Sequence, residues 1–317
     1  MKNDLLNEDL RVFIEVARKS SFAAAAEALG VSPAYISKRI HMLEAALAVK
    51  LFHRTTRRVV VSEDGERVYA LAQRILDDID HLYEEVSSTR RNPRGLLRVC
   101  SSFGFGRRVV APAISELSTL YPALQVRFEV FDRLVDVATE GFDLDIRVGD
   151  EIAPHHIARR LGDNRRVLCA SPAYLARRGR PRTLAELASH DCLVIKERDH
   201  PFGVWKLRGG NSGNNGNSGG NAEQTVKVTG PLSSNNGEIV VRWAVDGRGI
   251  VLRSLWDVGP MLATGELEQI LPECSQEANI WAVYPSRLTS SAKIRVCVEF
   301  FETFFRERAA AYAAMAG

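Results

Sequence analysis

The sequence predicts an α/β protein with a mainly helical amino-terminal part, and three observations support this. Short amphipathic patterns fill the first sixty residues. Apolar residues then repeat at heptad spacing between residues 64 and 91. Beyond residue 95, short apolar runs alternate with helical patterns, which is typical of βαβ units and a parallel sheet. We therefore expect three parts, at residues 1–63, 64–92 and 93–317.

The residue pattern of the first part, residues 1–63, predicts a winged helix-turn-helix. Residues 9–20 have apolar side chains at helical spacing, and Ser21 is a suitable cap for a second helix at residues 22–29. Gly30 is placed to end that helix. Ser32 then caps a third helix with Pro33 in its first turn, where the missing N–H costs nothing. A short strand at residues 59–62 would complete the wing.

The third helix has two chemically different faces. Ile36, Ile40, Leu43 and Leu47 share one face, which the core of this part would bury. The opposite face mixes cationic, hydroxyl, aromatic and small apolar groups, which suits phosphates, base edges and thymine methyls better than plain solvation. With the basic residues that follow, the candidate DNA-binding set is Ser32, Pro33, Ala34, Tyr35, Ser37, Lys38, His41, Arg54, Thr55, Arg57 and Arg58.

The charge distribution supports this interpretation, although the net charge is only +3. Between residues 38 and 58 only Glu44 opposes six basic residues, which are Lys38, Arg39, Lys50, Arg54, Arg57 and Arg58. Residues 63–85 are strongly acidic. A basic patch confined to one end of a chain is typical of nucleic-acid binding.

The second part predicts one long helix with an apolar stripe. The stripe consists of Val68, Ala72, Ile75, Ile79, Leu82 and Val86, separated by 4, 3, 4, 3 and 4 residues. The stripe either packs on its own domain or pairs with a second chain. We favour dimerisation, because the stripe is longer than the small amino-terminal part could cover.

The third part predicts alternating strands and helices. The expected elements are 96–101, 109–120, 126–131, 134–140, 144–148, 167–170, 172–178, 183–189, 192–195, 239–245, 250–252, 255–264, 280–284 and 292–310. The run at 209–221 is pure Gly, Asn and Ser, so we expect a flexible surface loop. A phosphate cradle is the alternative, but no lysine follows at the required spacing.

Several classes of protein and site are disfavoured. Five scattered cysteines without a CxxC pair disfavour a disulfide scaffold and a Cys-based zinc site, and suit a reducing cytoplasm. No apolar run reaches membrane-spanning length, and the acidic start is unlike a signal peptide. Neither a dinucleotide fingerprint nor a GxSxG motif occurs, so we expect no enzyme and no cofactor. Adjacent His155 and His156 should splay apart, so we expect no metal site.

The order of these residues resembles the LysR-type transcriptional regulators. The amino-terminal match is the run from Ser21 to Ser32, followed by Ile36-Ser37, Ile40, Leu43-Glu44, Leu51-Phe52, Arg54 and Ser62-Glu63-Asp64-Gly65. Ser171-Pro172-Ala173-Tyr174-Leu175 and Gly247-Arg248-Gly249-Ile250 are similar to the effector domain of that family. The chain departs from many members at Pro33-Ala34, Ala48 and Val61-Ser62.

The resemblance implies that residues from about 95 onward form two Rossmann-like α/β subdomains, as in periplasmic binding proteins. Their expected bounds are about 95–163 with 275–317, and about 164–274. A small effector would bind between them, at Ser101, Ser102, Phe103, Arg147, Ser234, Asn235 and Asn236. The serines are alternatively helix caps, Arg147 a structural partner of Asp143, Asp145 or Asp150, and Asp132 a helix cap.

The sequence therefore predicts a sequence-specific, effector-controlled transcriptional regulator that acts as a homodimer or homotetramer on double-stranded DNA. The arginine and amides of the cleft indicate an organic acid as effector. The alternatives are a two-lobed solute-binding or sensor protein without gene control, which leaves the basic end unexplained, and an α/β enzyme, which lacks a titratable constellation.

Overall fold

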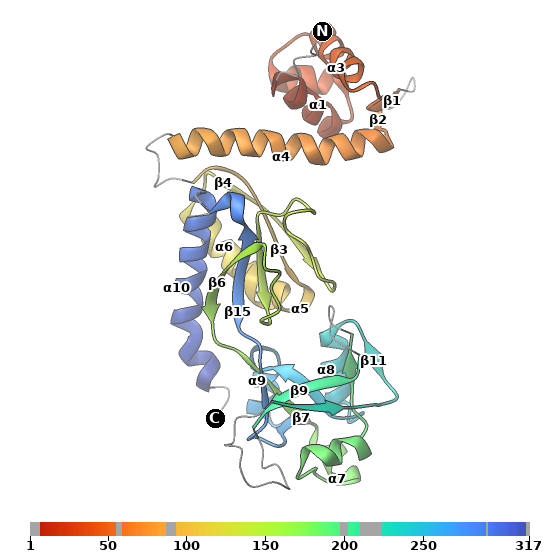
Figure 1. Ribbon diagram of the computed structural model, residues 1–317, viewed down its shortest axis with the longest axis vertical. Helices are drawn as coiled ribbons and strands as arrows, with labels where there is room; N and C mark the ends of the chain where they lie inside the picture. The colour runs from red at the N-terminus through yellow and green to blue at the C-terminus, as the bar shows by residue number, and fades with distance from the viewer. Residues whose placement is uncertain are drawn as a thin grey trace. The chain divides into compact units, whose positions relative to one another are not determined.

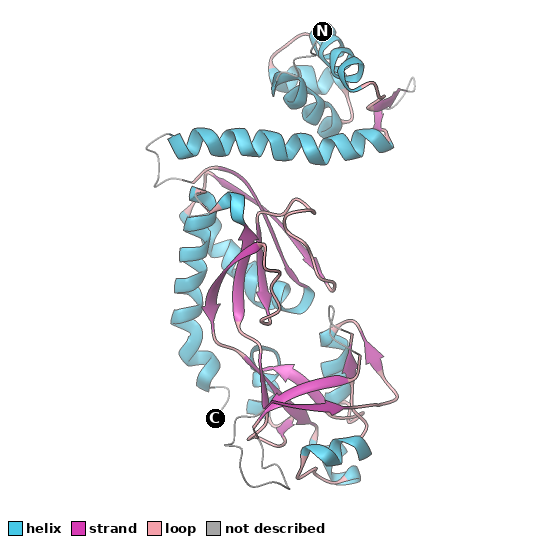
Figure 2. Cartoon of the chain, in the orientation of Figure 1, coloured by secondary structure: helices cyan, strands magenta, loops and turns pink. Residues whose placement is uncertain are grey.

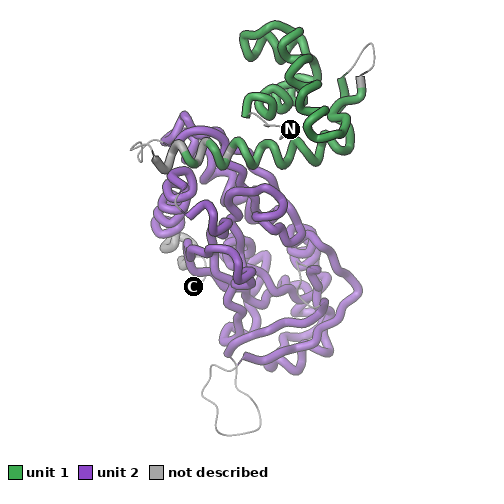
Figure 3. The backbone as a smooth tube through the Cα atoms, turned by 45° about the horizontal axis from the view of Figure 1, so that its top comes forward, with its two compact units in different colours: residues 1–90 green, residues 91–317 purple. Residues whose placement is uncertain are grey.

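The computed structural model describes residues 7–54, 59–86, 93–196, 202–209, 223–289 and 291–314. The chain divides into two compact units, residues 1–90 and 91–317 (Figure 3). Thr55, Arg57, Arg58 and nearly all of the Gly/Asn/Ser run lie outside the described residues. Within the described ranges, the helices are too short or too polar to cross a membrane.

The first unit is the expected winged helix-turn-helix followed by a long helix (Figure 1). Ser21 and Ser32 cap the second and third helices by accepting the N–H groups of Ala24 and Tyr35. Gly30 makes the turn between them at a φ of 66°, in the left-handed region that glycine adopts at low cost. The elements are α1 (Asn7–Lys19), α2 (Phe22–Leu29), α3 (Pro33–Leu47), β1 (Phe52–Arg54), β2 (Val59–Val61) and α4 (Glu63–Val86).

The apolar stripe of α4 is divided between two environments. Ala72 is buried in the core of the first unit, and Val68 packs against that core. Farther along the helix, Ile75 and Leu82 are 47% and 58% exposed. Packing on its own domain is therefore confirmed for the first half of the stripe, while the second half is exposed in the single chain. The side chain of Val86 lies outside the described residues.

The second unit has two lobes, and the first is built on a five-stranded sheet in the order β4-β3-β5-β15-β6. Its strands are β3 (Gly95–Ser102), β4 (Leu124–Phe131), β5 (Leu144–Val148), β6 (His156–Gly162) and β15 (Ile280–Pro285). β3 pairs in parallel with β4 and β5, as the βαβ pattern predicts. The helical segments are α5 (Phe103–Phe105), the π-helical η1 (Gly106–Val110), α6 (Ala111–Leu120), the 3₁₀ turn η3 (Ser286–Leu288) and α10 (Ala292–Ala314), of which α10 runs beside the sheet (Figure 1).

The second lobe is built on a sheet in the order β10-β9-β14-β7-β12, with β13 also paired to β7. Unlike the expected parallel sheet, its strands pair antiparallel within the described residues; the separate pair β8–β11 and the isolated bridge between Cys192 and Ile250 are parallel. The strands are β7 (Arg165–Ala170), β8 (Val194–Ile195), β9 (Val204–Arg208), β10 (Glu223–Lys227), β11 (Ser233–Ser234), β12 (Val251–Ser254), β13 (Glu268–Gln269) and β14 (Ser275–Glu277). The helices are α7 (Pro172–Arg178), the 3₁₀ helix η2 (Leu184–Ser189), α8 (Gly237–Val245) and α9 (Leu255–Thr264) (Figure 2).

One of the elements expected in this unit is wrong. Residues 134–140 form a turn rather than a helix, because Asp136 caps a single turn by accepting the N–H groups of Ala138 and Thr139, and Gly141, at a φ of 80°, ends it. The return to the first lobe, expected near residue 275, falls after Glu277, since β14 pairs with β7 in the second lobe.

Candidate nucleic-acid interface and interlobe cleft

The outer face of α3 presents most of the predicted DNA-binding residues. Ser32, Pro33, Ala34, Lys38 and His41 are exposed, and Ser37 is half-buried beside them. Ile36 and Ile40 on the opposite face are fully buried and fix the orientation of the helix. The predicted division of the helix into an inner and an outer face is therefore confirmed.

Two residues of this helix are instead engaged within the first unit. Arg39 is buried, and its Nε lies 2.7 Å from Asp9 Oδ1 in α1. The Tyr35 hydroxyl donates to Glu8 Oε1 at 2.5 Å, so it is not presented with the outer face. The sequence places Arg39 in the basic patch, but a buried, paired guanidinium is unavailable to phosphate.

Lys50 and Glu44 join the end of α3 to the wing. The Lys50 ammonium lies 3.0 Å from Glu44 Oε2, and Glu44 Oε1 accepts the N–H of Leu51 at 2.9 Å. Burial alone would raise the pKa of the Glu44 carboxyl, but these contacts hold the pKa below its ordinary value. Arg54 lies in β1, next to Val59 of β2, and its side chain is outside the described residues.

The two lobes of the second unit enclose a cavity of about 50 Å³. The first lobe lines it with Ser102, Gly104, Phe105, Phe131, Asp132 and Val148, and the second lobe with Arg166, Asn235, Gly237, Glu238, Arg253, Ser254 and Trp256. Two arginines, two carboxylates and an amide among these residues make the cavity strongly polar.

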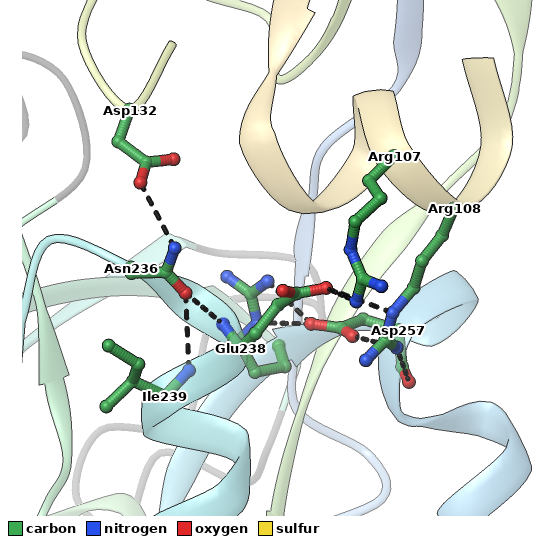
Figure 4. Close-up of polar contacts among 8 residues, drawn as sticks. Arg107, Arg108, Asp132, Asn236, Glu238, Ile239 and Asp257 are labelled. Atoms are coloured by element: carbon green, nitrogen blue, oxygen red, sulfur yellow. Dashed lines mark hydrogen bonds and ion pairs between the residues drawn. The ribbon is translucent and has the colours of Figure 1, made fainter. Parts of the chain in front are cut away.

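Charged side chains connect the lobes beside this cavity (Figure 4). Arg108 of η1 approaches two carboxylates of the second lobe, at 2.7 Å from Asp257 Oδ1 and 3.2 Å from Glu238 Oε1. Arg107 also pairs with Glu238. Asp257 is fully buried and binds Arg253 within its own lobe, with its Oδ2 2.9 Å from Nε. Ion pairs therefore join the two lobes, and they would break if the lobes moved apart.

Amide and hydroxyl groups at the start of α8 make a second connection. Asn236 caps α8 by accepting the N–H groups of Glu238 and Ile239. Its Nδ2 donates to Asp132 Oδ2 of the first lobe at 3.2 Å (Figure 4). Asp132 therefore contacts the opposite lobe rather than capping a local helix.

The predicted effector residues differ in their positions. Ser102 and Asn235 line the cavity. Ser101 is buried and donates its hydroxyl to the carbonyl of Ile146 at 2.6 Å, and Ser234 accepts the N–H of Asn236. Phe103 is partly exposed and lies outside the cavity lining.

Arg147 is not presented to the cleft as a charge partner, which corrects the prediction. It is 2% exposed, and its Nε donates to Asp145 Oδ2 at 2.7 Å. Its two terminal nitrogens donate to the carbonyls of Val135 and Glu151. Asp145 is thus the structural partner, one of the three carboxylates proposed as the alternative.

Sequence reasoning missed the cationic residues that do line the cavity, Arg166 and Arg253. Both lie in strands of the second lobe, where Arg253 interrupts the apolar run of β12. A charged residue inside a buried strand was the available signal. Gly237 allows the close approach, because a Cβ there would lie 2.3 Å from Arg253 Nη2.

The cysteines and histidines show one expected and one unexpected arrangement. All five cysteines are free and buried, and burial raises the pKa of Cys169 and Cys192 to about 12, so these thiols are poor nucleophiles at neutral pH.

His155 and His156 do not splay apart; their ring centroids lie 4.0 Å from each other. The backbone turns before β6, so strand alternation does not separate these side chains.

Comparisons with known proteins agree with both regions. A family model described as "Bacterial regulatory helix-turn-helix protein, lysR family" matches residues 7–66, and one described as "LysR substrate binding domain" matches residues 90–306. The chain is 57% identical to the transcriptional regulator DmlR of Escherichia coli, over 97% of both chains. It is 48% identical to the transcriptional activator TtdR of the same species, over 96% of this chain and 94% of that one.

Solved structures show the same architecture over nearly the whole chain. CrgA of Neisseria meningitidis, a LysR-type transcriptional regulator, is 28% identical with a TM-score of 0.56 and covers 95% of this chain and 99% of its own. AphB of Vibrio cholerae is similar in fold, at 23% identity and a TM-score of 0.54, over 94% and 98% of the two chains. The relatives are named as regulators, a non-enzymatic role. The chain therefore belongs to the LysR family of DNA-binding transcriptional regulators, which carry an effector-binding domain.

Proposed function

We propose that this regulator reads DNA with the outer face of α3 in the major groove, and that it acts in the cytoplasm. The observation that carries the proposal is the simultaneous exposure of Ser32, Ala34, Lys38 and His41, while the opposite face of the helix is buried at Ile36, Ile40 and Leu43. A cation, a hydroxyl and small apolar groups on one rigid face suit direct readout of bases and phosphates. Arg54, Thr55, Arg57 and Arg58 of the wing would contact the flanking backbone.

Replacing Lys38 by alanine should weaken binding to operator DNA about tenfold and reduce the dependence of the affinity on salt by about one phosphate contact. The duplex for this test is the region upstream of the gene, and fluorescence anisotropy measures the affinity. Lys227→Ala removes the same charge from an exposed position in β10 and is the control. Equal affinities for Lys38→Ala and wild type, with unchanged far-UV circular dichroism, would contradict the role of Lys38.

We further propose that two chains pair through the exposed half of the α4 stripe, so that two α3 helices reach successive major grooves. Ile75 and Leu82 are separated by seven residues, which places them on one side of the helix. Leu71, which the predicted stripe omits, is also 55% exposed. Isolated exposed apolar residues are common, but three on one helix favour a partner surface.

Replacing Ile75 by aspartate should dissociate this pair, because a carboxylate in the centre of an apolar contact would lose its hydration without gaining a partner. Size-exclusion chromatography with light scattering measures the mass, and also separates a dimer from a tetramer. Leu29→Asp, at a partly exposed position of α2, is the control. A wild-type mass for Ile75→Asp would exclude α4 as the main contact between chains.

We also propose that the interlobe cavity binds a small organic acid. Arg166 and Arg253 supply positive charge there, and the N-terminus of α8 begins beside Asn235. The effector would compete with Asp257 for the guanidinium of Arg253, and because Asp257 also binds Arg108 of the first lobe, the separation of the lobes would change. A thermal-shift series of carboxylates against amines of similar size tests the charge preference.

A further inference from the structure

Three side chains of the first lobe meet at a place that the regulatory function leaves unused. Asp136 lies in the turn after β4, His155 directly precedes β6, and His156 is the first residue of β6. Asp136 and the two histidines are some twenty residues apart in sequence and are brought together by the fold. We call these three residues the His-Asp cluster.

The donor atoms of the His-Asp cluster converge. His156 Nε2 lies 3.3 Å from Asp136 Oδ1, and His155 Nε2 lies 3.9 Å from Asp136 Oδ2. One donor atom from each residue lies within 4.8 Å of the other two. In a tetrahedral zinc site with bonds of about 2.0–2.1 Å, neighbouring donors are about 3.3 Å apart.

His156 adds an independent observation. Its side chain is only 3% exposed, yet among the described residues neither ring nitrogen has a hydrogen-bond partner. Its Nε2 faces the Asp136 carboxylate at ion-pair distance, and its Nδ1 has no partner among the described residues. A buried polar group without a partner is costly, so a buried imidazole in this state calls for a ligand.

We propose that Asp136, His155 and His156 form a binding site for a divalent transition-metal ion of the Zn²⁺ class. Two imidazoles and one carboxylate suit Zn²⁺ and its neighbours, whereas Mg²⁺ and Ca²⁺ prefer oxygen ligands throughout. Water completes the coordination, since His155 is 60% exposed. That exposure also leaves the His155 ring free to move toward Asp136 and His156, from the present 3.9 Å to the donor separation of about 3.3 Å.

Surrounding contacts hold the ligands in place. Asp136 Oδ1 accepts the N–H groups of Ala138 and Thr139 at 2.9 and 3.3 Å, which orients the carboxylate. Arg147 donates to the carbonyls of Val135 and Glu151, and so connects the segment that carries Asp136 to the segment that leads to His155. The bound ion would fasten the 132–140 turn to β6 and stabilise the first lobe.

The test uses the full-length protein without an affinity tag, stripped with EDTA and titrated with ZnCl₂ by calorimetry. We expect one Zn²⁺ per chain with a dissociation constant in the micromolar range or below, and a rise in melting temperature of about 5 °C at saturation. His155→Asn and His156→Asn should each weaken binding at least tenfold. His53→Asn, at an exposed position of β1, removes a histidine elsewhere and should bind as wild type.

His155→Asn is the decisive variant, because the exposed His155 side chain contributes little to the core and its replacement leaves the fold intact. The proposal fails if the wild type binds no Zn²⁺ at about 100 μM ZnCl₂, a hundredfold above a micromolar dissociation constant. It also fails if His155→Asn binds Zn²⁺ with wild-type affinity. Circular dichroism separates loss of metal binding from loss of folding in His156→Asn.

Discussion

Replacing Asp9 by alanine is expected to unfold the amino-terminal unit and abolish DNA binding. Asp9 is 3% exposed and is the close carboxylate partner of the buried Arg39, whose Nε lies 2.7 Å away. Removing one partner of a buried pair leaves an uncompensated charge, at a cost of about 3–5 kcal/mol. That cost is comparable to the whole stability of a small domain. Chemical denaturation followed by circular dichroism measures the loss.

Glu8→Ala is the matched control, because Glu8 is the adjacent acid and its side chain is largely exposed at 3.9 Å from Arg39. It should change the free energy of unfolding by less than about 1 kcal/mol. The double variant Asp9→Leu/Arg39→Met should recover much of the stability, because it removes both charges. A single variant Asp9→Ala as stable as Glu8→Ala would show that the buried pair does not hold α1 against α3.

Replacing Asp257 by alanine is expected to destabilise the effector-binding unit by a similar amount. Asp257 is fully buried and accepts from Arg253 of its own lobe and from Arg108 of the opposite lobe. Without it, the guanidinium of Arg253 is buried without its nearest anion, at a cost of about 3–5 kcal/mol. The melting temperature of this unit should fall by about 10 °C. Differential scanning calorimetry measures the transition.

The chain supplies a close control in Asp246→Ala. Arg242 and Asp246 also form an i,i+4 pair, with Nε 3.3 Å from Oδ1, but both side chains are exposed. Loss of this exposed ion pair should shift the melting temperature by no more than about 2 °C. Equal shifts for the two variants would mean that burial and the contact between lobes add nothing to the role of Asp257.

The helical part of the fold could be predicted because its signals are local. Ser21, Gly30 and Ser32 mark helix ends through contacts within a few residues, and these ends are where the structure has them. The faces of α3 follow from a period that is fixed by helix geometry. The turn at 134–140 resisted prediction, because Asp136 caps it and Gly141 ends it after a single turn, which an apolar pattern does not reveal.

The cleft was less predictable because its charges depend on pairing between distant segments. Arg147 and Arg253 are both buried strand arginines, and only the fold shows that Asp145 and the carbonyls of neighbouring segments engage Arg147 whereas Arg253 lines the cavity. The His155–His156 pair was misjudged because adjacency alone does not separate two side chains where a turn meets a strand. Sequence pattern predicts elements well, but not which partner a charged side chain finds.

The most direct measurement of the central claim is equilibrium binding of the unmodified full-length chain to the duplex upstream of its own gene and to a shuffled duplex of the same composition. The account predicts preferential binding to the upstream duplex, with an affinity that falls steeply between 50 and 200 mM salt, by about 10³-fold if six phosphates are contacted. Equal affinity for both duplexes, or an affinity that salt does not change, would contradict sequence-specific DNA recognition by the face of α3.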